Sequence, residues 1–299
     1  MMKLNWLQFF SSLLIVSTIF FFFFSSVSRS SLPIHFYTTV ETNFYHPLGR
    51  VNDDLNNLKP QEIIDYFYWS NASSCQLAHE MWKDPSGLDG QKAVCLDPQV
   101  RPPPGDCIIY SFGISNEWSF DEAMEAYGCR VFAFDPSMGK GNHNHSRNIQ
   151  FFNIGLSDRD YTTEKGWQMK TLSSIYKLLV PFHGERIIDY LKIDIESAEW
   201  DVLPQLIPSG MFAKVRQLGV EFHLDNRGDT LEKIIWRVKA IKFIEDAGMI
   251  RFDSKYNMWA KRQITVLDLY EAPFCFEIAF YQYLPSSTPF NPVYTFSKH

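Results

Sequence analysis

The chain has 299 residues, 45% of them hydrophobic, which is enough for one full core with extensions. Its formal net charge is −6 and no stripe of Lys and Arg is visible, which argues against a nucleic-acid binder.

The N-terminus carries a long uncharged run, residues 4–28, between Lys3 and Arg29. Such a run can cross roughly 30 Å of hydrocarbon. We favour an uncleaved signal anchor over residues 1–28. The alternative is a cleaved signal peptide, for which Ser26-Val-Ser28 offers small residues. Either segment sends the remaining chain into the secretory lumen, as a single-pass type II protein of the ER or Golgi membrane or as a secreted protein.

Sequons and cysteines agree with that compartment. Asn71-Ala-Ser73 and Asn144-His-Ser146 are glycosylation sequons. The cysteines are five in number, and an oxidising lumen permits them to pair. The pairs that we expect are Cys75 with Cys95 and Cys107 with Cys129, and we expect Cys275 to be a small buried hydrophobe.

Three segments follow the membrane run. Residues 29–60 are polar, contain scattered prolines and show no periodicity, which is typical of a stem. Residues 61–106 carry one short helical pattern around Ile63 and Phe67 and end in the stiff run 101–105. This segment is interpreted as a cap on the main domain, and residues 107–299 as that domain.

From Cys107 onward, short apolar strands alternate with helices. Ser119-Phe-Asp-Glu122 fits a capping box, and Gly128 and Gly248 mark helix ends. The expected strands cover residues 107–112, 130–134, 151–154, 190–195, 217–222, 250–256 and 275–281, with helices at 119–127, 172–179, from near 198 and after 229. This alternation predicts an α/β fold with a mostly parallel sheet covered on both faces, whose last two strands form an antiparallel pair at one edge.

Polar residues follow the first three strands. Gly113, with Ser115 and Glu117 behind it, sits in a turn where backbone can approach a ligand, although this segment alone favours an ordinary strand-to-helix turn. Asp135 ends the second strand, where a carboxylate commonly accepts two ribose hydroxyls, or caps a turn. Ser157-Asp158 occupies the third position, either beside an adenine ring or in a simple turn.

The stretch Leu191-Lys-Ile-Asp-Ile-Glu-Ser-Ala-Glu199 is the most informative one. It delivers Asp194 and Glu196 to the carboxyl edge of the sheet, where they can bind a cation, orient a hydroxyl or act as a base. Helix capping accounts for Glu199. His223, after the fifth strand, is a candidate base or its partner, although a lone histidine is more often structural. His143-Asn-His145 has metal-ligand spacing but lies in a Gly/Asn loop, so no metal is predicted.

These motifs together resemble the FkbM-type S-adenosylmethionine-dependent methyltransferases and, more narrowly, animal methyltransferase-like proteins. The resemblance implies a seven-stranded Rossmann-like sheet that binds S-adenosyl-L-methionine at its carboxyl edge. It implies that Gly113 and its neighbours hold the methionine part, Asp135 the ribose and Ser157-Asp158 the adenine. Asp194 and Glu196 then face the transferred methyl group and its acceptor.

The chain departs from the family's pattern at the glycine turn. The pattern Asp/Glu-x-Gly-x-Gly-x-Gly here has Ser111 for the acid, and Ser115 and Glu117 for the later glycines. An acid that pairs with the methionine ammonium is therefore missing, and Glu117 is the substitute that we consider.

The function predicted from the sequence is methyl transfer to an oxygen of a glycan or another lumenal acceptor, with Asp194, Glu196 or His223 handling the hydroxyl proton. Two alternatives stay open. One is a non-catalytic module that kept the fold and lost the cofactor, which the depleted glycine turn favours. The other is a type II glycosyltransferase, in which Asp194-Ile-Glu196 would serve as a metal-nucleotide motif.

Overall fold

The computed structural model describes residues 55–82, 91–224, 229–257 and 260–284, all of which belong to one compact unit, residues 45–299. The predicted signal anchor and most of the predicted stem lie outside the described residues. Within the described ranges, no helix is both long and apolar enough to cross a membrane.

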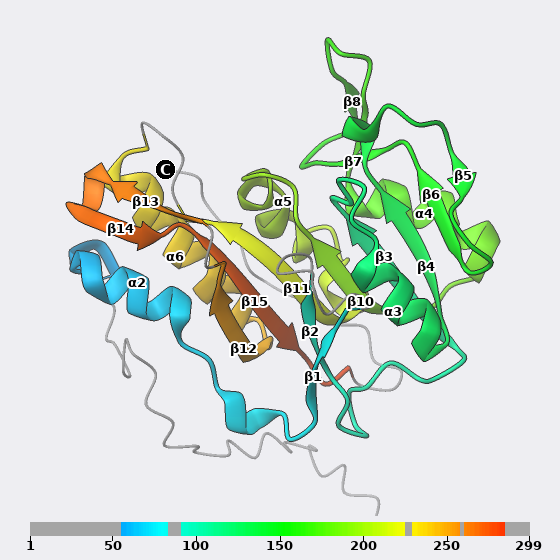
Figure 1. Ribbon diagram of the computed structural model, residues 1–299, viewed down its shortest axis with the longest axis horizontal. Coiled ribbons are helices and arrows are strands. Elements are labelled where there is room, and N and C mark those ends of the chain that lie inside the picture. The colour runs from blue at the N-terminus through cyan, green and yellow to red at the C-terminus, as the bar shows by residue number, and fades with distance from the viewer. Residues whose placement is uncertain (1–54, 83–90, 225–228, 258–259, 285–299) are drawn as a thin grey trace, which may run out of the picture. The chain divides into compact units, whose positions relative to one another are not determined.

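The centre of the fold is an eight-stranded sheet with the order β12-β15-β11-β10-β3-β4-β6-β5 (Figure 1). Its strands are β3 (Cys107–Phe112), β4 (Cys129–Phe134), β5 (His143–Asn144), β6 (Ile149–Phe152), β10 (Ile188–Ile193), β11 (Val215–His223), β12 (Ile250–Tyr256) and β15 (Cys275–Tyr281). β15 runs antiparallel to β11 and β12, β5 runs antiparallel to β6, and the other pairs are parallel. The seven expected strands are thus present, and the two-residue β5 adds an eighth.

Helices cover both faces, as the strand–helix alternation predicts. They are α2 (Pro60–Tyr68), α3 (Ser119–Tyr127), α4 (Leu172–His183), α5 (Glu199–Leu206) and α6 (Leu231–Asp246). Every residue of β3 and of β10 is buried, because helices and the cap cover both faces of these central strands. Side chains alternate between the faces: Ile108 joins the core under α2, α4, α5 and α6, whereas Ile109 joins the core under α3.

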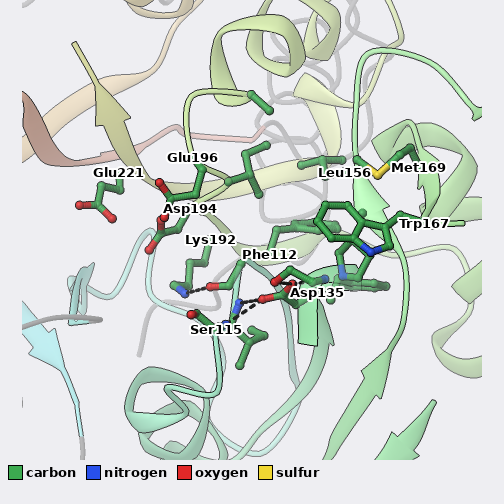
Figure 2. Close-up of a pocket in the computed structure, with 18 of the residues that line it drawn as sticks. Phe112, Ser115, Asp135, Leu156, Trp167, Met169, Lys192, Asp194, Glu196 and Glu221 are labelled. Atoms are coloured by element: carbon green, nitrogen blue, oxygen red, sulfur yellow. Dashed lines mark hydrogen bonds between the residues drawn. The ribbon is translucent and has the colours of Figure 1, made fainter. Parts of the chain in front are cut away.

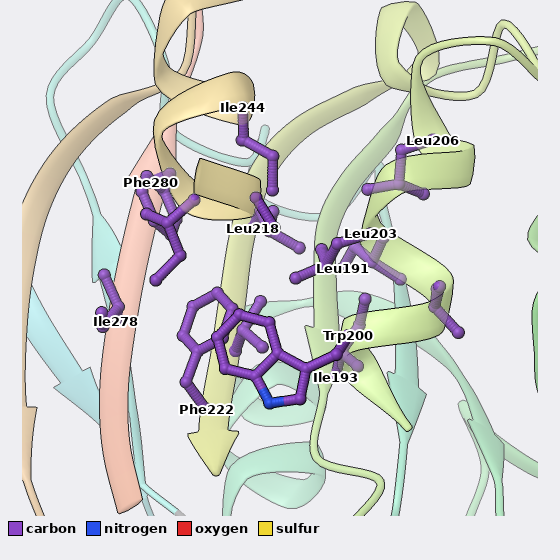
Figure 3. Close-up of a cluster of buried hydrophobic side chains, with 14 of the residues drawn as sticks. Leu191, Ile193, Trp200, Leu203, Leu206, Leu218, Phe222, Ile244, Ile278 and Phe280 are labelled. Carbon is purple, nitrogen blue, oxygen red and sulfur yellow. The ribbon is translucent and has the colours of Figure 1, made fainter. Parts of the chain in front are cut away.

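The larger core lies between β10, β11, β15 and the helices α5 and α6. Figure 3 shows Trp200 and Leu203 of α5 against Leu191 and Ile193 of β10. Trp200 also packs on Phe222, with ring centroids 4.8 Å apart. This packing fixes α5, and with it the acidic turn between β10 and α5.

The predicted cap packs against both faces of the sheet. Its helix α2 joins the larger core through Ile63 and Phe67. A hairpin, β1 (Ala78–Met81) with β2 (Lys92–Cys95), lies over the opposite face. The amide of Gln217 brackets Cys95, accepting from its backbone N–H at 2.8 Å and donating to its carbonyl at 2.7 Å. The sequence did not predict this hairpin, because its pairing depends on contacts with the sheet.

Both predicted disulfides are present, Cys75–Cys95 and Cys107–Cys129, and Cys275 is free and buried. The second disulfide joins directly paired residues of β3 and β4. The first closes the loop that contains the hairpin.

Several predicted boundaries were wrong. The residue before helix α3 is Trp118, and Ser119 lies inside the helix, so the expected capping box does not form. β6 ends at Phe152, two residues before the prediction, and β10 ends at Ile193, which places Asp194 in the turn beyond it. The helix α4 continues through Pro181 to His183, four residues beyond the prediction. The helical spacing of apolar residues did not indicate this last turn.

Two small sheets were also missed. They are β7 (Gly155–Leu156), β8 (Tyr161–Thr162) and β9 (Gln168–Lys170) in one, and β13 (Lys261–Ile264) with β14 (Leu269–Pro273) in the other. Strands this short carry no readable alternation.

Candidate active site

A cavity of about 400 Å³ opens at the carboxyl ends of β3, β4 and β10 (Figure 2). The chain leaves β3 toward β4 on one side, and β10 lies on the other side of β3. Such a switch in strand order is where open α/β sheets bind ligands. Acidic side chains gather at one end of the cavity and Leu156, Trp167 and Met169 at the other.

The backbone of Gly113 lies so close to the backbone of Asp194 that position 113 has no room for a side chain. Its φ is +78°, and a Cβ there would lie 1.5 Å from the carbonyl oxygen of Asp194. Its N–H donates to Phe134 O at 3.0 Å, and its own carbonyl accepts from Lys192 Nζ at 2.8 Å. The turn therefore requires glycine and is fixed to both neighbouring strands.

Asp135 organises that turn. One carboxylate oxygen accepts from the backbone N–H of Ile114 at 3.0 Å and of Ser115 at 2.7 Å. The other accepts from the backbone N–H and the hydroxyl of Ser137, at 2.8 Å and 2.6 Å. A carboxylate offers about four lone-pair sites, so this arrangement fills them. Binding of a ribose by Asp135 would first need the Ser137 hydroxyl to rotate away.

Ser115 and Glu117 line the cavity. Glu117, however, accepts a hydrogen bond from the backbone N–H of Ser119 at 2.9 Å and so caps helix α3. A buried acid does lie close to the turn, but it comes from the helix: Asp121 is fully buried. Burial raises the pKa of Asp121 to about 6, against the opposing charge of Lys192.

Ser157 and Asp158 are not among the residues that line the cavity; Ser157 Oγ donates to Asp158 Oδ1 at 3.3 Å instead. Leu156, Trp167 and Met169 form that wall. Trp167 and Met169 were not predicted, and their one signal in the sequence is an isolated pair of large apolar residues in a polar stretch.

At the acidic end, three carboxylates stand in a row across three strands. Glu221 pairs directly with Glu277 of β15, and Asp194 comes one residue after Ile193, the partner of Val220. Lys92 of the cap hairpin reaches this row. Its Nζ lies 2.6 Å from Glu277 Oε1 and 3.6 Å from Asp194 Oδ2, and the side chain is 2% exposed.

The charges of this row are strongly coupled. Burial works against ionisation of Asp194, but Lys92 and Lys192 outweigh it and lower the pKa of that carboxyl. Burial, together with the charges of Asp194 and Glu277, raises the pKa of Glu221. Lys92 and Glu277 were absent from the predicted site, because the folded cap brings Lys92 to it and the pairing of β15 with β11 brings Glu277.

Glu196 lines the cavity, and its side chain is 89% exposed. It has φ +54° and Ser197 has φ +78°, so two successive residues without the freedom of glycine adopt the left-handed region in the turn after β10. Such backbone strain is concentrated at functional sites.

His223 lies beside the cavity and is not part of its lining. Its Nδ1 is 2.7 Å from Glu199 Oε1, which also accepts from the backbone N–H of His223 at 2.9 Å. Burial opposes the charged ring, but hydrogen bonds to Cys275 and Glu199 outweigh it and raise the pKa of His223. Glu199 was expected to cap a helix; it is instead fully buried as the partner of His223.

The sequence matches the family described as "Methyltransferase domain" over residues 52–267. This range is more than half of the chain, and the protein therefore belongs to that methyltransferase family. Membership supports the predicted cofactor, S-adenosyl-L-methionine.

Among individual proteins, the chain is similar to "Probable methyltransferase-like protein 24" of Homo sapiens, at 28% identity over 201 residues, 62% of this chain and 54% of that protein. The Rattus norvegicus protein of the same name is 34% identical over 140 residues, 44% of this chain and 38% of that protein. The chain thus spans about half or less of the length of these relatives. The narrower resemblance to animal methyltransferase-like proteins is confirmed.

Two solved structures show a distant likeness. A fibrillarin pre-rRNA processing protein from Methanococcus jannaschii has 7% identity and a TM-score of 0.33, over 69% of this chain and 88% of that one. Aeropyrum pernix fibrillarin, a complex with natively bound S-adenosyl-L-methionine, has 15% identity and a TM-score of 0.32, over 62% and 69%.

Proposed function

We propose that this protein transfers a methyl group from S-adenosyl-L-methionine to an oxygen of an acceptor in the secretory lumen. One observation carries the proposal. In a chain of a methyltransferase family, a cavity lies at the switch point of the sheet, beside a turn that only glycine fits. The FkbM-type subfamily stays a prediction from the motif at residues 191–199.

The lining residues fit such a cofactor. The backbone of Gly113 to Ser115 is open to the cavity where the methionine part is expected. Leu156, Trp167 and Met169 offer an apolar wall to an adenine ring, which stacks on aromatic side chains. Asp135 holds the ribose once the Ser137 hydroxyl turns from it.

At the acidic end, the chain's task is alignment. The cofactor supplies an electrophilic methyl group, so the protein gains rate mainly by holding the acceptor oxygen in line with it. Asp194 is the group that we assign to the acceptor hydroxyl, as proton acceptor or as anchor. Lys92 at 3.6 Å keeps negative charge on the half-buried Asp194 favourable. Exposed Glu196 can meet a second acceptor hydroxyl.

The proposed acceptor class follows from the predicted compartment. The uncharged N-terminal run and the two sequons support a lumenal location, where glycan hydroxyls are abundant. A protein hydroxyl is the other acceptor of this chemistry.

The second candidate is a non-catalytic module of the same fold. Two observations favour it: the lone pairs of Asp135 are all occupied within the protein, and Ser111 stands in place of the usual acid. The glycosyltransferase alternative has no support from the family match.

Calorimetry on the purified full-length chain tests these proposals. Saturable binding of S-adenosyl-L-methionine and S-adenosylhomocysteine is expected, weakened in Trp167→Ala and unchanged in His143→Ala, because His143 is not among the residues that line the cavity. A folded protein that binds neither would favour the non-catalytic module. Binding of a nucleotide-sugar with manganese instead would favour the glycosyltransferase.

A further inference from the structure

Three side chains with metal-ligating atoms meet at the ends of β11 and β15. Glu221, His223 and Cys275 each offer one ligand atom, and these atoms lie within 4.8 Å of one another. All three side chains are buried, at 6%, 8% and 4% exposure. Buried groups of this kind are uncommon unless they are paired or bind a metal.

The sheet register itself builds this cluster. His223 and Cys275 are directly paired residues of antiparallel strands, and Glu221 precedes His223 by two residues. Because side chains alternate along a strand, Glu221 and His223 point to the same face. The ligand atoms are therefore held by two central strands and do not depend on a loop.

Cys275 is the one cysteine of the chain outside the two disulfides. We expected it to be an ordinary buried hydrophobe, but its neighbours on this face are His223 and Glu221. A thiol among a histidine and a carboxylate has the surroundings of a ligand.

Glu199 orients the histidine as metal-binding histidines usually are. Its Oε1 lies 2.7 Å from His223 Nδ1 and accepts from the backbone of the same residue. A neutral ring that donates from Nδ1 to a carboxylate keeps its lone pair on Nε2, which can then bind a cation. The Nε2 atom of His223 lies 3.5 Å from Glu196 Oε2.

The surroundings are rich in negative charge. Asp194, Glu196, Glu199, Glu221 and Glu277 all lie on this side of the site, and Lys92 is already held by Glu277 at 2.6 Å. Glu199 Oε2 and Glu277 Oε2 are buried without a hydrogen-bond partner among the described residues. Buried carboxylate oxygens favour a positive charge close by.

From this geometry we infer that Glu221, His223 and Cys275 bind one Zn²⁺ ion. A thiolate, an imidazole and a carboxylate suit zinc, and three protein ligands leave one position open, as in catalytic sites. Glu221 also lines the cavity, so the ion borders the acceptor side of the proposed active site. The open position would bind an acceptor oxygen there. Metal binding does not require the proposed methyl transfer, and the two can fail separately.

Metal analysis of the full-length protein tests the inference. After dialysis against trace zinc, about one equivalent of zinc per chain should remain bound. Substitution by Co²⁺ should give the thiolate-to-cobalt absorption band in the near ultraviolet. Cys275→Ser, which keeps the side chain's size, should abolish that band. Glu199→Gln should weaken metal affinity about 10- to 100-fold, the usual effect of removing such an orienting partner.

The control variant is His143→Ala, which should bind zinc normally. His143 is exposed and lies on the edge strand β5, whereas the cluster lies on β11 and β15. Should Cys275→Ser not fold, the wild type alone decides, because bound zinc should slow the reaction of Cys275 with a thiol reagent at least tenfold. A folded wild type that retains no zinc and shows no cobalt–thiolate band overturns the inference. Equal zinc content in Cys275→Ser and wild type overturns it as well.

Discussion

Gly113 and Asp194 contact each other across the switch point, and each restricts the other. The carbonyl of Asp194 occupies the space where any side chain at position 113 would begin. The backbone N–H groups of the same turn donate to Asp135, and the carbonyl of Gly113 accepts from Lys192. Replacing Gly113 should therefore affect stability, whereas replacing Asp194 should affect activity.

Gly113→Ala combines a left-handed φ with a backbone clash. We expect it to lower the free energy of unfolding by about 4 kcal/mol, in the range of severe backbone strain. Urea unfolding measures this. Gly139→Ala is the matched control, since Gly139 has φ +63° but nothing within 4 Å, and should cost only about 1 kcal/mol. Equal losses in the two variants would contradict the close approach to Asp194.

Asp194→Asn removes the proposed proton acceptor with little change of shape. Methyl transfer to a hydroxyl acceptor should fall by about 10²- to 10⁴-fold, while cofactor binding stays within a few fold. Asp158→Asn is the control, because Asp158 lies outside the cavity lining. Retained turnover in Asp194→Asn would remove this residue from the catalytic role.

Asp121 should give stability a pH dependence between about pH 4 and 6. Its folded pKa is raised from 3.8 to about 6, so the folded state holds a proton that the unfolded state has lost in this window. Stability then falls as pH rises through the window, by up to about 3 kcal/mol, and stays lower above it. Unfolding curves of Asp121→Asn should lack this slope. An unchanged slope would assign it to another group.

At the scale of elements, the cap hairpin β1–β2 packs on the face of the sheet opposite to α2 and contacts the candidate active site. It brings Lys92 to the carboxylate row, and Tyr190 Oη donates to Ala93 O at 2.9 Å beneath it. The Cys75–Cys95 disulfide closes this segment, with a sequence separation of 20 residues.

Removing that disulfide should destabilise the protein by about 3 kcal/mol, the value expected for a loop of this length. The double variant Cys75→Ser/Cys95→Ser, followed by chemical unfolding, provides the measurement. Reduction of the wild type should give a loss at least as large, because it also opens Cys107–Cys129. A double variant as stable as the wild type would show that sheet contacts alone hold the hairpin.

For the whole molecule, the open question is the compartment, and the sequons allow a direct test. Asn144 is exposed on the edge strand β5, whereas Asn71 is half-buried and its backbone N–H donates to Arg251 O at 3.0 Å. We therefore expect Asn144 to carry a glycan when the chain is expressed in animal cells. An endoglycosidase should lower the apparent mass of the wild type, with a smaller shift for Asn144→Gln. No shift in either would argue against lumenal exposure.

Much of the fold was readable from the sequence, because its signals are local. Apolar runs at residues 107–112 and 275–281 predicted β3 and β15 without error, and Gly128 ends its helix in the left-handed region as expected. The acids at 135 and 194 lie at the cavity for the same reason, since strand ends in a parallel sheet share one edge.

What the sequence by itself determined is therefore the order of the main strands and helices and the residues that follow strand ends, which depend on neighbouring residues in the chain. The disulfide partners, 20 and 22 residues apart, were also predicted, from the segments in which the cysteines lie. The tertiary structure alone decided that Lys92 contacts Glu277, that Trp167 walls the cavity, and that His223 meets Glu199 and Cys275. These contacts join residues 24 to 185 positions apart or depend on the register between strands. No local periodicity encodes that register; it is set by how the cap, the helices and β15 pack onto the sheet.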